Sequence, residues 1–266
     1  MDCTCGHHHA PAADTGGTEL TLSRPLVALH GQLICRDAAQ MMLALDLLPE
    51  HASLTRAEPG CLRFDVAQTD DPLVWTLDEV FADEDAFAAH QARAKDSEWG
   101  RRSADLGRDF HRHPLLPRLR PEAAGDVAGT AALLRAAFGG EDEAALLHAL
   151  RAAGDLTHSL IAHAGGVPVG HVALSPLRAE RPALALAPVA VHPALQGRGL
   201  GSALVRAALH AAGDLPVVVL GEPGFYARFG FVPADLASPY AGPHLMIRGG
   251  LPEGSAIAHA PAFAAL

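Results

Sequence analysis

A glycine-rich segment between an apolar run and a helical pattern most constrains what this chain can fold into. The segment reads Gln196-Gly197-Arg198-Gly199-Leu200-Gly201. An apolar run, residues 184–191, precedes it, and apolar residues at helical spacing follow it over residues 200–212. This order predicts a strand, a tight loop and a helix, and glycine lets the backbone of such a loop approach a ligand closely. Because the free N–H groups and the dipole at a helix start attract anions, the segment predicts a pyrophosphate site.

An aromatic motif further along the chain supports this prediction. It reads Tyr226-Ala227-Arg228-Phe229-Gly230-Phe231. Together, the loop and this motif resemble the GCN5-related N-acetyltransferase (GNAT) family, whose coenzyme-A-binding pattern is Gln or Arg, two residues, Gly, one residue, and Gly or Ala. Gln196, Gly199 and Gly201 fill that pattern. The resemblance runs from about residue 119 to residue 263, and residues 186–191 and 220–223 resemble the YhbS-like group of small bacterial acetyltransferases.

The resemblance implies acetyl-CoA as the cofactor and a small-molecule amine as the acceptor. Backbone N–H groups of the loop would bind the pyrophosphate, and two strand residues would bind the pantetheine arm through their backbones. The implied cofactor-binding residues are Val189, Val191, Gln196, Gly197, Arg198, Gly199, Leu200 and Gly201. Tyr226 would act as general acid, because a phenol with the ordinary pKa of about 10 can protonate a thiolate of similar basicity. The alternative is a ring that only packs against the coenzyme.

The general base stays open at the level of sequence. The acceptor amine must be neutral to attack a thioester, and the long strand over residues 183–191 contains no acid that could take its proton. Glu222, just beyond the next strand, is the favoured candidate, and His171 and His192 are the alternatives. An acceptor that arrives already deprotonated would need no base.

Residue patterns in the first half predict a different unit. Alternation predicts strands over residues 26–35, 61–68, 73–81 and 109–113. One helix is expected after an N-cap at Asp37, with a kink or break at Pro49, and a second helix is expected from Asp83. The side chains expected to face the core from these helices are Met41, Leu45, Leu48 and Ala52 in the first, and Phe87, His90 and Ala94 in the second. The order strand, helix, strand, strand, helix, strand is ferredoxin-like.

Residues 55–64, together with Glu79 and His90, resemble the antibiotic-biosynthesis monooxygenase family, which includes quinol monooxygenases. The resemblance covers about residues 25–116 and implies a dimeric module that oxidises aromatic compounds with oxygen and needs no flavin or metal. Glu79, His90 and Trp75, with His30, would then line a cavity in which a phenol loses a proton; alternatively, Glu79 and His90 form only a structural hydrogen bond. This half contains no asparagine, which family members often use for oxygen chemistry. The alternative function is therefore ligand binding or dimerisation alone.

These patterns predict an α+β chain. Residues 1–24 are expected to form a mobile tail, in which Cys3, Cys5 and His7 to His9 either bind a metal or have no metal-dependent function. Residues 25–116 are expected to form a ferredoxin-like domain of the dimeric α/β barrel type. Residues 117–266 are expected to form the GNAT acyl-CoA N-acyltransferase α/β domain, and no functional metal site is predicted.

Charge and hydropathy narrow the choice of partners. A formal net charge of −10 argues against a broad nucleic-acid surface, which needs clustered cations. No apolar run approaches the roughly 20 residues of a membrane span, and the start of the chain lacks the pattern of a signal peptide. We therefore expect a cytoplasmic enzyme with reduced cysteines, a small-molecule substrate, no nucleic-acid or membrane partner, and a homodimer formed through the N-terminal domain.

Overall fold

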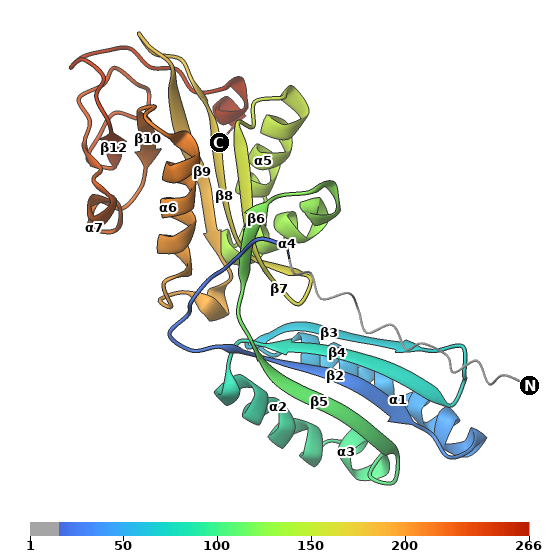
Figure 1. The fold of residues 1–266 in the computed structure, drawn as a ribbon. Helices are drawn as coiled ribbons and strands as arrows, with labels where there is room; N and C mark the ends of the chain where they lie inside the picture. Colours follow the sequence, from blue (N-terminus) through green and yellow to red (C-terminus); the bar gives the residue numbers. More distant parts are fainter. Residues whose placement is uncertain (1–15, 266) are drawn as a thin grey trace, which may run out of the picture.

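The chain folds into two β-sheets, each with its own helices (Figure 1). The computed structural model describes residues 16–265. Strand β5 (Gly107–Leu115) ends the smaller sheet, and strand β6 (Arg118–Pro121) begins the second half of the chain in the larger sheet. No helix in this part of the chain has the length and apolar character that crossing a membrane requires. The mixture of helices and antiparallel and parallel strands confirms the predicted α+β class.

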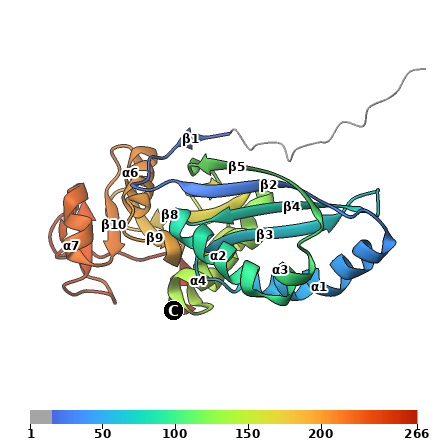
Figure 2. The same cartoon turned by 90° about the horizontal axis from the view of Figure 1, so that it is seen from below.

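The smaller sheet has four antiparallel strands in the order β3-β4-β2-β5. Its elements are β2 (Leu26–Ile34), α1 (Ala38–Arg56), β3 (Cys61–Gln68), β4 (Val74–Phe81), α2 (Glu84–Asp96), α3 (Glu98–Arg102) and β5 (Gly107–Leu115). Figure 2 shows all three helices on one face of this sheet. The order of elements and the pairing are those of a ferredoxin-like fold, which confirms the expected architecture.

Helix α1 differs from its predicted inward stripe. Leu45 is 41% exposed, whereas Gln40, His51 and Thr55 are buried. These polar side chains can be buried because they have partners: the Gln40 side chain accepts a hydrogen bond from the backbone N–H of Arg36, and the Thr55 hydroxyl donates one to the carbonyl of His51. The helix also continues through the proline that was expected to kink or break it. Helix α3, capped by a serine, was not predicted.

The larger sheet has the strand order β1-β6-β7-β8-β9-β10-β12-β11. Its strands are β1 (Thr18–Glu19), β6 (Arg118–Pro121), β7 (His158–Ala164), β8 (Val167–Leu177), β9 (Ala183–Val191), β10 (Val217–Leu220), β11 (Val232–Pro233) and β12 (Leu245–Arg248). The helices of this half are α4 (Val127–Phe138), α5 (Asp142–Ala153), α6 (Leu200–Ala212) and α7 (Pro223–Tyr226), with 3₁₀ turns at Ala124–Asp126, Pro193–Leu195, Ala227–Phe229 and Pro261–Ala265. Helices α4 and α5 pack on one face of β8 and β9, and α6 packs on the other (Figure 1).

Part of the segment expected to be a mobile tail belongs to this sheet. Thr18 and Glu19 pair with Leu119 and Arg118 of β6, and Leu22 is only 6% exposed. The prediction is wrong for these residues, because their ordering depends on a strand about 100 positions further along the chain. The Cys3 to His9 segment lies outside the described residues.

The two sheets share one hydrophobic core. Leu26, Val80 and Ala82 from the smaller sheet belong to the same buried cluster as Ala164 and Val169 of the larger one. Apolar contact of this kind makes the two halves stabilise each other. The halves are therefore expected to unfold together.

Polar contacts add to this interface. The Arg63 guanidinium donates a 2.6 Å hydrogen bond to the carbonyl of Gly165, in the turn between β7 and β8. Arg198, from the glycine-rich loop, donates to the carbonyl of Ala82 and to the Asp83 carboxylate, both at 2.7 Å. Each of the two arginines thus donates hydrogen bonds from its own half of the chain to residues of the other half.

Replacing Leu26 by alanine tests the shared core. The residue is fully buried, and the cavity left behind should lower the free energy of unfolding by about 2–5 kcal/mol. Calorimetry should show one unfolding transition in both wild type and variant, shifted to lower temperature in L26A. The control is Leu54→Ala in α1. Leu54 is 46% exposed, so this variant should shift the transition little. Two resolved transitions would contradict the shared core.

Candidate functional site

The glycine-rich loop connects β9 to α6, as the sequence predicts. Gly197 and Gly199 have φ angles of 75° and 94°, a region that side-chain-bearing residues rarely adopt. The Gln196 side-chain amide donates a 3.3 Å hydrogen bond to the carbonyl of Val191 at the end of the strand. The glycines therefore permit the turn, and the glutamine holds it against the strand.

The start of α6 carries free hydrogen-bond donors. Gly199 is its N-cap and supplies no side chain, and within residues 16–265 no acceptor bonds the backbone N–H groups of residues 197–201. A Cβ atom placed on Gly197 or Gly199 would meet nothing within 4 Å, so the space in front of the loop is open. The Arg198 side chain bonds Ala82 and Asp83, which leaves its backbone N–H as a possible donor to a ligand. Such a helix start can bind an anion.

Strands β9 and β10 part soon after they meet. They pair in parallel only at Leu184 with Val217 and at Ala185 with Val218. Further along β9, Ala187 and Pro188 lie together opposite a single residue of β8, which is a β-bulge. From there to the loop, no strand in the described part of the chain pairs with the β10-facing edge of β9. Val189 and Val191 lie on this stretch, whose backbone could pair with an extended ligand.

Tyr226 lies beside this gap, at the end of α7. Its side chain is 8% exposed, belongs to the core on the α6 side, and also lines a cavity on the opposite side of the sheet. A Cβ atom at Gly221 would overlap the tyrosine ring, so this glycine is needed for the close approach. Burial raises the pKa of Tyr226 to about 12. The phenol is therefore protonated at neutral pH and can donate a proton.

The cavity beside Tyr226 has a volume of about 400 Å³. Strand β9 forms one wall over residues 185–189, and helices α4 and α5 form another. Its polar side chains are those of Glu143, Glu222, Tyr226, Tyr240 and His259. Sequence reasoning found Glu222 and Tyr226 but missed the other three, because they come from segments without a motif and meet only through tertiary packing.

The three predicted candidates for a general base lie in different places. Glu222 lines the cavity, is exposed, and caps α7 by accepting the N–H of Gly224 at 3.5 Å. His171 is fully buried, lies 2.9 Å from the Ser159 hydroxyl, and has its pKa lowered to about 4 by desolvation. His192 accepts the N–H of Ala194, and burial lowers its pKa. Neither histidine lines the cavity, so Glu222 is the one candidate of these three that shares it with Tyr226.

The smaller domain has its own cavity, of about 380 Å³, between the sheet and its helices. Glu79 and His90 line it, as predicted from the sequence, and each is less than 5% exposed. Trp75 does not line it but packs in the core of the domain. His30 also lies elsewhere, with its Nδ1 2.6 Å from the Asp78 carboxylate. The structure therefore brings together two of the four residues proposed for this cavity.

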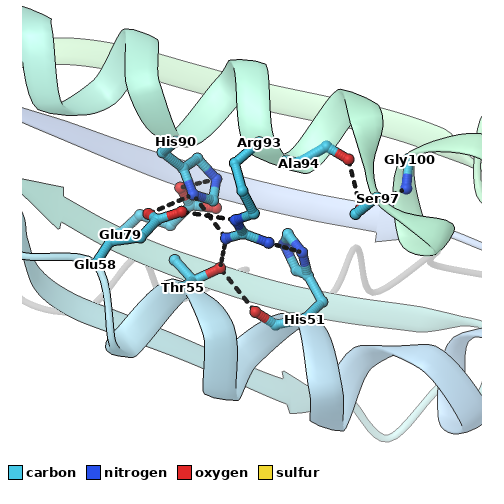
Figure 3. Close-up of polar contacts among 9 residues, drawn as sticks. All are labelled: His51, Thr55, Glu58, Glu79, His90, Arg93, Ala94, Ser97 and Gly100. Carbon is cyan, nitrogen blue, oxygen red and sulfur yellow. Dashed lines mark hydrogen bonds and ion pairs between the residues drawn. The ribbon is translucent and has the colours of Figure 1, made fainter.

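A half-buried polar network supports one wall of this cavity (Figure 3). Arg93 of α2 donates to the Glu58 carboxylate and to the Thr55 hydroxyl, both at 2.7 Å. The Glu58 carboxylate also lies 3.0 Å from Nδ1 of His90. Sequence reasoning missed this role of Arg93 and Glu58, because a half-buried ion pair between a helix and a distant turn leaves no local signature.

The network leaves Glu79 without a hydrogen bond. Its Oε2 atom is buried and unpartnered among the described residues, and it lies 3.9 Å from Nε2 of His90, beyond hydrogen-bonding distance. The hydrogen bond considered between Glu79 and His90 is therefore absent, and His90 contacts Glu58 instead. Desolvation, with a contribution from Glu58, raises the pKa of Glu79 to about 7. Desolvation by burial lowers the pKa of His90.

Comparisons with known proteins match both halves. The Acetyltransferase (GNAT) family profile matches residues 127–231, and the Antibiotic biosynthesis monooxygenase profile matches residues 37–99. The uncharacterized N-acetyltransferase YhbS of Escherichia coli K12 is 39% identical over 120 residues, which cover 42% of this chain and 72% of that protein.

Two solved structures are also similar to part of this chain. The crystal structure of E. coli YhbS in complex with CoA aligns with a TM-score of 0.51 at 32% identity, covering 56% of this chain and 92% of that one. A GNAT acetyltransferase from Brucella melitensis in complex with acetyl-CoA aligns with a TM-score of 0.48 at 34% identity, covering 55% and 97%.

The C-terminal half contains the open helix start, the separated strands and the buried tyrosine. This half also shares more than a third of its aligned residues with an N-acetyltransferase. The chain belongs to the GNAT acetyltransferase family and carries, in front of its acetyltransferase domain, a ferredoxin-like domain whose residues 37–99 match the Antibiotic biosynthesis monooxygenase profile.

Proposed function

We propose that the chain transfers the acetyl group of acetyl-CoA to a small-molecule amine, in the domain formed by residues 117–266. The observation that carries the proposal is the free row of N–H groups over residues 197–201, beside a strand edge that no other strand covers. The diphosphate of the coenzyme fits the first feature, and its extended pantetheine arm fits the second. That the similar structure of E. coli YhbS has CoA bound supports this choice of acetyl donor.

The loop residues, the two strand valines and Tyr226 each have a role in this proposal. Residues 197–201 bind the diphosphate through their backbones, and Val189 and Val191 bind the arm. Tyr226 gives its proton to the sulfur that leaves the thioester, and its raised pKa keeps that proton available at neutral pH. The cavity on the α4 and α5 side receives the acceptor, because Tyr226 reaches it through the gap between β9 and β10.

A second function is proposed for residues 25–116: the binding of a small aromatic compound that carries a hydroxyl group. The cavity of about 380 Å³ is large enough for such a compound, and its walls include Phe87, Trp99 and Phe110. Glu79 and His90 both line this space, and a carboxyl oxygen of Glu79 lies 3.9 Å from a ring nitrogen of His90, so a phenol bound there would lie beside both residues. A carboxyl group with a pKa of about 7 is suited to take a phenol proton.

A reaction of the bound compound with oxygen would distinguish a monooxygenase from a module that only binds its ligand. Oxygen uptake with a panel of quinols would support monooxygenation, and binding without uptake would support the alternative of a ligand-binding or dimerisation domain. Homodimerisation through this domain and a cytoplasmic location remain predictions.

Gly199→Asp tests the coenzyme site. A side chain and a negative charge at the helix start should weaken acetyl-CoA binding by about 100-fold or more, a loss of roughly 3 kcal/mol. Titration calorimetry measures this affinity. The control is Gly154→Asp, a glycine with φ of 75° and open space at the end of α5, which should bind normally. Unchanged affinity in G199D would remove the site assignment.

Tyr226→Phe tests the proton donor. The ring and its packing are kept, so acetyl-CoA should bind with nearly wild-type affinity, while kcat should fall by about 10²-fold or more. Steady-state release of free thiol, followed together with calorimetric binding, separates the two effects. An unaltered kcat would mean that another group protonates the sulfur.

Glu79→Gln tests the buried carboxyl through the pH dependence of stability. The folded protein keeps the Glu79 proton up to a pH of about 7, whereas the unfolded chain loses it near 4.5. Because the folded state binds more protons in this window, wild-type stability should fall across it by about 3 kcal/mol more than that of E79Q. Denaturant titrations at pH about 4.5 and about 8 measure the difference. The control Glu50→Gln, on the exposed side of α1, should match the wild type, and equal pH slopes for E79Q and wild type would contradict the buried acid.

A further inference from the structure

The charges around the C-terminal cavity are of one sign. Among the described residues that line it, Glu143 and Glu222 carry the ionisable carboxyl groups and no lysine or arginine is present. The rest of the lining is mainly apolar, with strand β9 on one side and Phe138 and Phe263 on others. Such a pocket attracts a cation carried on an apolar body and disfavours a carboxylate.

A histidine lies within this cavity. The ring of His259 is packed between Tyr240 and Phe263, with centroid distances of 5.2 and 5.0 Å. Its Nδ1 atom is buried and has no hydrogen-bond partner among residues 16–265. The Tyr240 hydroxyl donates a 3.0 Å hydrogen bond to the backbone carbonyl of Phe263 and is not engaged by the histidine. The imidazole is therefore fixed by its neighbours and keeps a nitrogen free.

We propose that the acceptor is a primary amine on an aromatic or alkyl body without a carboxylate, and that His259 takes the proton from its ammonium group. This inference rests on the proposed acetyltransferase function. Glu143 and Glu222 attract the ammonium to the cavity, the apolar walls bind the body, and His259 and Tyr226 share the cavity in which the reaction takes place.

His259 fits the role of base better than Glu222. Glu222 is exposed to solvent and already accepts the N–H of Gly224 as the cap of α7. His259 is enclosed by two aromatic rings, and burial lowers its pKa, so its imidazole is neutral at pH 7 and can accept a proton. The other titratable side chains facing this cavity are Glu143 from α5, Tyr226 from α7 and Tyr240.

The transfer balances with these groups alone. The ammonium gives one proton to His259, and the neutral nitrogen forms a bond to the thioester carbonyl carbon. The carbon–sulfur bond then breaks with its electron pair on sulfur, which takes the phenol proton of Tyr226. The second amine proton restores the phenol, and the His259 imidazolium releases its proton to solvent, so that one proton is released for each amide formed.

Matched amines test the acceptor class in the full-length protein. Acetyl-CoA binding is first measured by calorimetry, and thiol release is then followed with 2-phenylethylamine, L-phenylalanine and ethanolamine. We expect kcat/KM for 2-phenylethylamine to exceed that of the other two by at least about tenfold. L-phenylalanine carries a carboxylate that the acidic cavity disfavours, and ethanolamine has no apolar body to fill it. No binding of acetyl-CoA would refute the proposed function itself. Binding together with a preference for L-phenylalanine or ethanolamine over 2-phenylethylamine would refute only the acceptor class.

Glu143→Gln separates attraction of the ammonium from chemistry. The variant should raise KM for 2-phenylethylamine several-fold with little change in kcat, because it removes a charge that acts on binding. The control is Asp142→Asn in the same turn of α5, which does not line the cavity and should leave KM unchanged. An unchanged KM in E143Q would refute its role.

His259→Gln tests the base. At pH about 7 we expect kcat/KM to fall by about 10²-fold, with acetyl-CoA affinity unchanged. The defect should shrink near pH 10, where free amine is abundant without a base. Control variant His148→Gln, on the exposed side of α5, should behave as wild type, and Glu222→Gln is measured in parallel. A pH-independent defect in H259Q, no defect, or a pH-dependent defect in E222Q alone would overturn the assignment.

Discussion

The separation of β9 from β10 is the constraint on which the acetyltransferase half depends. Parallel pairing stops after Ala185, and the bulge at Ala187 and Pro188 follows at once. Proline has no N–H group and cannot complete a ladder, so this sequence favours an open edge at this point. The gap lets Tyr226 contact the core on one face and the cavity on the other. Had the strands stayed paired, the tyrosine would have no route between the two sides.

Local patterns in the sequence were sufficient where a feature depends on neighbouring residues. The glycine loop, the N-cap at Asp37 and the strand positions of Val189 and Val191 follow from short-range signals, and the structure contains these elements. Alternation also placed Glu79 on the buried side of β4. For such features, the spacing of glycines, caps and apolar residues is itself the physical cause.

Features that depend on distant partners could not be predicted. The inward side of α1 was misjudged because its buried polar residues are stabilised by hydrogen bonds, which hydrophobic periodicity cannot detect. The partner of His90 was misjudged because the choice between Glu58 and Glu79 depends on how α1 and α2 pack around Arg93. Likewise, His259 belongs to no motif, and only the folded chain brings it to the cavity of Tyr226.

Asp83 connects the chemistry proposed for the two halves. Its carboxylate caps α2, the helix that carries His90, by accepting the N–H of Ala86, and it also accepts from Arg198. A single carboxylate thus braces both the helix that borders the cavity of one half and the glycine-rich loop of the other half. An unrelated module in place of the N-terminal half would leave Arg198 without these acceptors unless it supplied others at the same place. Fusion in one polypeptide keeps that match inherited as a unit.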